Sequence, residues 1–91
     1  MSDSLTGLPN RRAFEMEASR MVARARRSAA RITVGIADID FFKNVNDIHG
    51  HLTGDEVLSS VSAVLSQSAR SSDFVARIGG EEFGLIFPDA A

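Results

Sequence analysis

The chain has 91 residues, which suits one small domain or part of a larger one. Apolar residues make up 44% of it and charged residues 24%, a balance that supports a core and argues against disorder. A net charge of −2 and the absence of cysteine exclude a globally basic nucleic-acid binder, disulfides and thiolate metal sites. No apolar run approaches the roughly 20 residues of a membrane span, and no secretory signal opens the chain. We therefore expect a cytoplasmic protein, with no nucleic-acid partner and no membrane contact in this segment.

The first predicted element is a helix over residues 11–29. Gly7 and Pro9 punctuate the loop before it, and Asn10 is placed to cap it. Apolar residues recur at helical spacing at Phe14, Ala18, Met21, Ala25 and Ala29. The other face is rich in arginine, which is typical of a solvated helix surface, with a phosphate or partner surface as the alternative.

The remaining elements alternate between strands and helices. Residues 32–40, "ITVGIADID", predict a strand buried on both faces. A polar connection follows over 41–55, with one helical turn at 43–48, and then a helix over 54–69. Strands at 74–78 and 83–87 form a hairpin, and the third strand is expected between the other two. This predicts an α/β fold whose sheet contains antiparallel strands and carries its helices on one face. We expect this fold to be incomplete, because nothing in the sequence covers the outer edge of the first strand.

The acidic residues supply the first candidate site. Asp38 ends a predicted buried strand, where carboxylates seldom lie without a partner. If the first and third strands pair antiparallel, Asp38 approaches Glu81 in the hairpin turn. Two such carboxylates suit Mg²⁺, which binds through one or two of them plus substrate phosphates. The alternative is two solvated acidic turns.

Other polar residues have ordinary explanations beside functional ones. His49 and His51 flank Gly50, but no third ligand is spaced to complete a metal site with them. Lys43 is a phosphate donor or a solvated lysine. Asn46 and Asp55 could read a base edge or cap a helix.

Three motifs, which occur in a fixed order along the chain, favour the functional explanations over the ordinary ones. They are "DSLTGLPNRRAF" at the start of the chain, "DIDFFKNVNDIHGHLTGDEVL" over 38–58, and "RIGGEEF" over 77–83. Together they resemble the GGDEF family, the diguanylate cyclases, with Glu81 in place of the aspartate in the family name. The resemblance runs over nearly the whole chain and about the first half of a family domain, so residues 1–91 are expected to be a partial GGDEF domain that lacks the C-terminal strands and helices. It implies a core of the ferredoxin-like, palm type.

The resemblance also implies roles for individual residues. Asp38, Glu81 and the Ile39 carbonyl would hold Mg²⁺ or Mn²⁺, with Glu82 at a second metal. The implied GTP-binding groups are the side chains of Lys43, Asn46, His51 and Asp55 and the backbone at Phe41, Phe42, Gly79 and Gly80. Glu81 is the implied base, and Lys43 would stabilise the phosphates.

The implied reaction joins two GTP molecules into cyclic di-GMP and releases pyrophosphate, with one GTP on each subunit of a homodimer. Arg70 and Asp73, in "RSSD", match the family's inhibitory product site, although Arg70 also suits a helix C-terminus. We expect the 91-residue piece alone to be inactive. The alternatives are a cyclic di-GMP receptor that uses Arg70 and Asp73, and an inert truncated fragment. The whole protein could be anchored to a membrane through a sensor region outside this segment.

Overall fold

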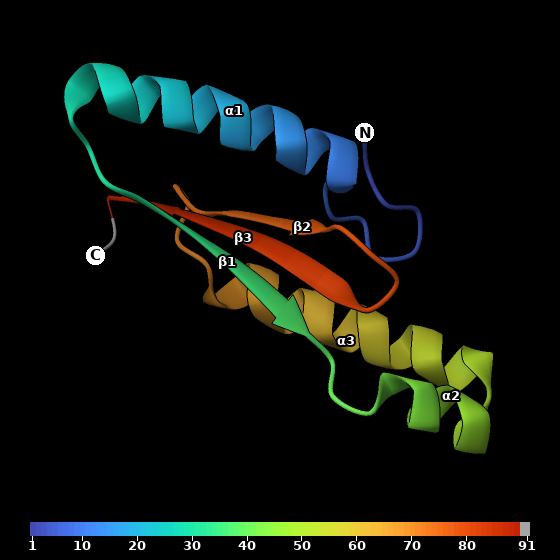
Figure 1. The fold of residues 1–91 in the computed structure, drawn as a ribbon. Helices are drawn as coiled ribbons and strands as arrows, with labels where there is room; N and C mark the ends of the chain where they lie inside the picture. The colour runs from blue at the N-terminus through green and yellow to red at the C-terminus, as the bar shows by residue number, and fades with distance from the viewer. Residues whose placement is uncertain (90–91) are drawn as a thin grey trace.

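The computed structural model describes residues 1–89, with a three-stranded sheet between helices (Figure 1). Ala90 and Ala91, the last residues of the predicted domain, lie outside the described residues. The sheet order is β1-β3-β2, and both pairings are antiparallel. This confirms the predicted α/β fold and the central place of the third strand. In chain order the elements are α1 (Arg11–Ser28), β1 (Ile32–Asp38), α2 (Phe42–His49), α3 (His51–Ser68), β2 (Phe74–Arg77) and β3 (Glu82–Pro88).

Helix α1 begins and ends as its sequence predicts. The Asn10 side chain accepts a hydrogen bond from the Ala13 N–H at 2.9 Å, so the expected N-cap is present. Arg26 and Arg27 lie in the last turn, where positive charge favours the helix dipole. The helix stops at Ala29, which takes a left-handed conformation with φ 57°.

The helices cover both faces of the sheet, so the expectation that they share one face was wrong. Figure 1 shows α1 on one side of the strands and α3 with α2 on the other. The cause lies in β3, where Phe83 packs with Leu58 of α3 and Gly84 lies under the Phe14 ring of α1. Successive residues of a strand point to opposite faces, and both faces of β3 are apolar. Each face therefore needs its own helix.

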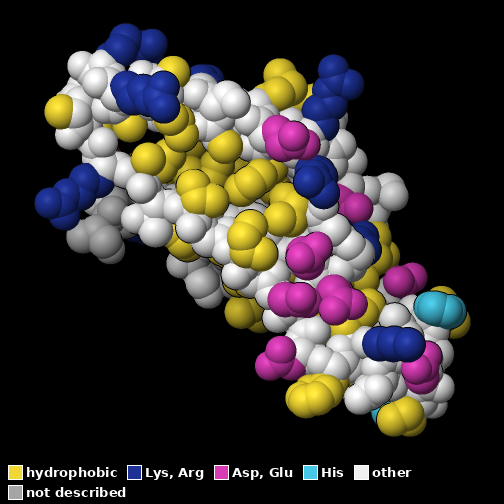
Figure 2. Space-filling view, viewed as in Figure 1, with side chains coloured by type: hydrophobic (Ala, Val, Ile, Leu, Met, Phe, Trp, Pro, Cys, Tyr) yellow, Lys and Arg dark blue, Asp and Glu magenta, His cyan; other side chains and the backbone are white. Residues whose placement is uncertain are grey.

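The sequence suggested that β1 is buried on both faces, and this was wrong. The strand buried on both faces is β3. Phe83 and Ile86 of β3 are 0% exposed, whereas Val34 and Ile36 of β1 are 51% and 60% exposed. Strand β1 lies at the edge of the sheet, and α1 extends mainly over β2 and β3. Figure 2 shows the resulting apolar surface over the sheet beside α1. Apolar composition alone could not distinguish an edge strand from a central one.

The connection after β1 is more helical than predicted. Helix α2 runs over two turns, and α3 begins three residues earlier than expected, so that Gly50 alone separates them. Gly50 has φ 87° and ψ 166°, a positive-φ conformation that glycine adopts without strain. The polar composition of α2 obscured the one-sided contact that Phe42, 8% exposed, makes with the core. Over residues 1–89, no helix has the length and apolar character needed to cross a membrane.

Candidate functional site

The acidic hairpin turn lies against the end of β1. Asp38 is the register partner of Glu82, and the Ile39 N–H donates to the Glu81 carbonyl at 3.3 Å. Antiparallel pairing of β1 with β3 therefore brings the Asp38 and Glu81 side chains together. Figure 2 shows acidic side chains gathered at this end of the molecule, whereas the basic ones crowd around α1.

The neighbouring Asp38 carboxylate disfavours ionisation of Glu81. Partial desolvation, followed by the negative charge of Asp38, raises the pKa of Glu81, and Glu82 adds a smaller contribution. A bound cation would remove this repulsion. Hard divalent cations are the natural partners of such an oxygen pair. Across residues 1–89 no group of three or more His, Asp or Glu side chains is placed to hold a metal, so a cation here would need backbone and substrate oxygens as well.

A cavity of about 400 Å³ opens beside this pair. Helices α2 and α3 form one wall and the hairpin turn forms the other. Lys43 and Asn46 share one face of α2, and His51 and Asp55 share one face of α3, because residues three or four apart are neighbours on a helix. Seven residues predicted to bind the nucleotide or the metal line this cavity: Phe42, Lys43, Asn46, His51, Asp55, Gly80 and Glu81.

The other predicted residues lie around the cavity but do not line it. Phe41 is 77% exposed and takes a left-handed conformation with φ 59°, where it turns the chain from β1 into α2. The carboxylate of Glu82 folds back over Gly79, so that Glu82 Oε1 would be 2.5 Å from a Cβ at that position. The Glu82 side chain thus lies against the turn and is not among the residues that line the cavity.

Arg77 is a residue of this site that the sequence analysis missed. Its guanidinium donates to the Gly79 carbonyl at 3.2 Å, to the Gly80 carbonyl at 2.8 Å and to the Asp3 carboxylate at 3.1 Å. Its side chain is only 17% exposed and lines the cavity. A charged residue inside a short buried strand needs such partners. The position of Arg77 in an apolar strand was therefore the sequence feature that could have revealed its role. Arg77 fixes the backbone of the turn that carries Glu81.

Asp3 ties the N-terminal loop to the same turn. Burial of Asp3 opposes its ionisation, but hydrogen bonds from Thr6 and from Arg77 outweigh this effect and lower its pKa. The Arg77 N–H also donates to the Pro9 carbonyl at 3.0 Å. The loop before α1 is thus bonded to the strand that leads into the turn.

The predicted pair at the other end of the sheet is formed within the chain. Arg70 Nη2 lies 2.8 Å from Asp73 Oδ1 and also donates to the Pro88 carbonyl at 3.0 Å. The Asp73 side chain is 4% exposed, whereas that of Arg70 is 56% exposed. The hydrogen bond from Arg70 lowers the pKa of Asp73. The guanidinium of Arg70 is thus held in place and remains accessible to solvent.

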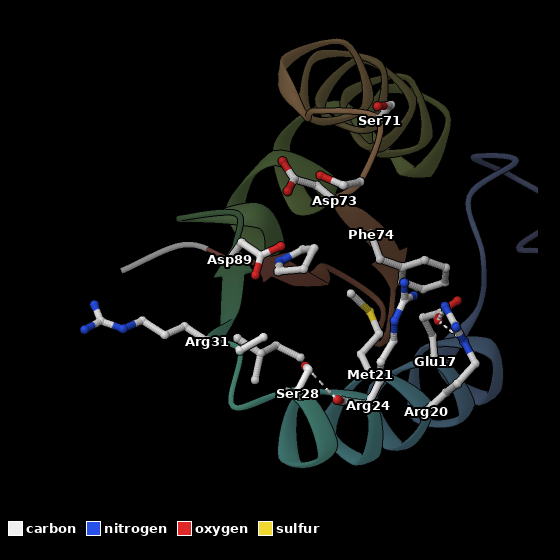
Figure 3. Close-up of a pocket in the computed structure, with 15 residues that line it drawn as sticks. Glu17, Arg20, Met21, Arg24, Ser28, Arg31, Ser71, Asp73, Phe74 and Asp89 are labelled. Carbon is white, nitrogen blue, oxygen red and sulfur yellow. Dashed lines mark hydrogen bonds and ion pairs between the residues drawn. The ribbon is translucent and has the colours of Figure 1, made fainter.

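A larger cavity, of about 630 Å³, lies between α1 and the sheet, away from the acidic turn (Figure 3). Arg20 and Arg24 border it from α1, and Arg31 lies on the side of Asp89 and points outward (Figure 3). Arg20 is paired with Glu17. This cavity contains none of the residues predicted for GTP or metal.

Fold and site together define an α/β domain in which an acidic glycine hairpin borders a polar cavity. Residues 1–91 match the family model described as the diguanylate cyclase, GGDEF domain. The chain belongs to this family.

Relatives of known activity agree with this assignment. The chain is 44% identical over 88 residues to the diguanylate cyclase DgcP of Pseudomonas aeruginosa, a match that covers 97% of this chain and 13% of the relative. It is 44% identical over 89 residues to the diguanylate cyclase DosC of Escherichia coli, covering 98% of this chain and 19% of the relative. The chain therefore spans only a small part of these proteins.

A solved structure is similar over almost the whole chain. The GGDEF domain of DgcB from Caulobacter crescentus, in complex with c-di-GMP, superposes with a TM-score of 0.96 at 46% identity. The match covers 99% of this chain and 51% of that one. Residues 1–91 thus correspond to about half of that structure.

Proposed function

We propose that this chain is the N-terminal part of a GGDEF domain and that the protein carrying it is a diguanylate cyclase. It would condense two molecules of GTP into cyclic di-GMP and release pyrophosphate. The observation that carries the proposal is the cavity between α2, α3 and the hairpin turn, which opens beside the Asp38 and Glu81 carboxylates. The activities named for the relatives support it.

The residues in and around the cavity divide into three tasks. Asp38 and Glu81, with the Ile39 carbonyl, would hold Mg²⁺ or Mn²⁺, and the raised pKa of Glu81 beside Asp38 supports this assignment. Lys43 and the backbone N–H groups of Phe41 and Phe42 would bind phosphates. The base would lie against Asn46, His51 and Asp55, which reach the cavity from two helices.

The chemistry requires positioning and neutralised charge more than covalent catalysis. The metal, when bound, would lower the pKa of the attacking 3′ hydroxyl and neutralise charge on the phosphates. Glu81 would accept the proton of that hydroxyl, and Gly79 and Gly80 would let the backbone approach the nucleotide. Because each subunit holds one GTP, two copies must face each other for the bond to form.

The direct test is conversion of GTP by the intact protein. We expect cyclic di-GMP and pyrophosphate to form when Mg²⁺ or Mn²⁺ is present, and no product after chelation. Residues 1–91 alone should show little or no turnover, because the remainder of the domain is needed to complete the site. Absence of product from the intact dimer with either metal would refute the proposed activity.

A second function, product binding, is favoured by the Arg70–Asp73 pair. An accessible arginine held by a buried carboxylate suits contacts with a guanine or a phosphate. We expect Arg70→Ala to weaken cyclic di-GMP binding by about 10- to 100-fold, the range for a lost charged hydrogen bond. Calorimetry with cyclic di-GMP measures this. Arg12→Ala, exposed in the first turn of α1, is the matched control, and equal affinity in both variants would exclude the site.

A further inference from the structure

Gly54 of α3 lies directly against the side chain of Asn46. Gly54 is buried, and a Cβ placed on it would overlap Asn46 Oδ1 and lie 2.9 Å from Asn46 Cγ. The Phe42 ring is also close, with its Cζ 3.3 Å from that Cβ position. Any side chain at residue 54 would therefore displace the amide of Asn46.

The backbone does not require glycine at this position. Gly54 is helical and is not among the residues with positive φ. Glycine is the poorest helix former after proline, so alanine would favour the helix itself. The feature that calls for glycine here is the space that Asn46 occupies.

This contact orients the amide. Asn46 Oδ1 is fully buried and has no hydrogen-bond partner among the described residues, yet Asn46 lines the cavity. With Oδ1 packed against α3, the NH₂ group is the end of the amide that can reach a ligand. The Asp55 carboxylate lines the same cavity, so the wall offers a hydrogen-bond donor beside an acceptor.

We propose that Gly54 is a positioning residue that sets base selectivity through the orientation of Asn46. A carboxylate such as Asp55 accepts two parallel bonds from the N1–H and 2-amino groups of guanine. Adenine has no such pair of adjacent donors. The NH₂ of Asn46, held in place by Gly54, would bond an acceptor of the same base. This inference rests on the proposed function and assigns the specificity of its nucleotide site.

The test measures the affinities of GDP and ADP for the intact protein by calorimetry, since neither nucleotide can release pyrophosphate. Gly54→Ala is expected to weaken GDP binding by about tenfold or more and to reduce the preference for GDP over ADP by a similar factor, the effect of one misplaced base contact. Gly35→Ala is the matched control, because a Cβ there makes only ordinary contacts at 3.7 Å and beyond. It should leave both affinities unchanged.

A double-mutant cycle separates positioning from general structural damage. In an Asn46→Ala background, adding Gly54→Ala should change the GDP affinity by less than about twofold, because the two residues act as one unit. Additive losses would overturn the inference. If Gly54→Ala alone fails to fold, the double variant must recover the fold, because it removes the overlap. A double variant that stays unfolded would also overturn it.

The outcome for the unmodified protein distinguishes this inference from the proposed function. An unmodified protein that binds GDP no better than ADP refutes both. An unmodified protein that prefers GDP, with a folded Gly54→Ala variant that keeps the same preference, refutes only the role of Gly54.

Discussion

Glu81→Gln is expected to reduce the rate of GTP condensation by about 10²- to 10³-fold, the usual effect of removing one preorganised charge-stabilising group. Glutamine keeps the size of the side chain but can neither accept the hydroxyl proton nor bind a metal as a carboxylate. Initial rates of pyrophosphate release at saturating GTP and Mg²⁺ measure the effect. Glu56→Gln, on the exposed surface of α3, is the matched control and should retain full activity.

The thermal stability of Glu81→Gln should not fall with its activity. Partial desolvation and the charge of Asp38 raise the pKa of Glu81 in the folded state. Its contribution to stability is therefore fully present below its unfolded pKa and is lost as the pH rises through its folded pKa. At neutral pH the glutamine variant lacks this repulsion, so without metal or nucleotide it should unfold at the same temperature as the unmodified protein or a higher one. A variant that melts earlier but retains turnover would contradict both the repulsion and the catalytic role.

Phe83→Ala is expected to lower the free energy of unfolding by about 3–5 kcal/mol, the range for truncating a buried phenylalanine. Phe83 is 0% exposed and packs in one cluster with Leu8, Phe42, Leu58 and Val75. That cluster joins the N-terminal loop, α2, α3 and the hairpin, so the cavity walls share this support. A domain has only about 5–15 kcal/mol of stability, so the loss is a large part of the total.

Urea unfolding of the intact protein without nucleotide measures this effect. Leu52→Ala is the matched control, since Leu52 is 81% exposed and its truncation should change stability by no more than about 0.5 kcal/mol. A loss below about 1 kcal/mol for Phe83→Ala would mean that the cluster does not support the walls of the site.

Local patterns along the chain predicted most of the elements. The period of α1, its Asn10 cap and the glycine turn between β2 and β3 each depend on residues a few positions apart. The ordered motifs likewise contain most of the residues that line one cavity. The sequence analysis was weaker where local composition misled, as in α2, whose polar residues obscured a helix anchored by the buried Phe42.

The amino-acid sequence by itself thus determined the two long helices, the hairpin, the acidic turn and the family. Only the tertiary structure decided which strand is central, which faces the helices cover, and how the site is supported. Those features depend on contacts between residues far apart in the chain, such as Arg77 with Asp3, or on the space between two helices, as with Gly54 and Asn46. Hydrophobic periodicity records which side of an element is apolar, but not which partner will cover it.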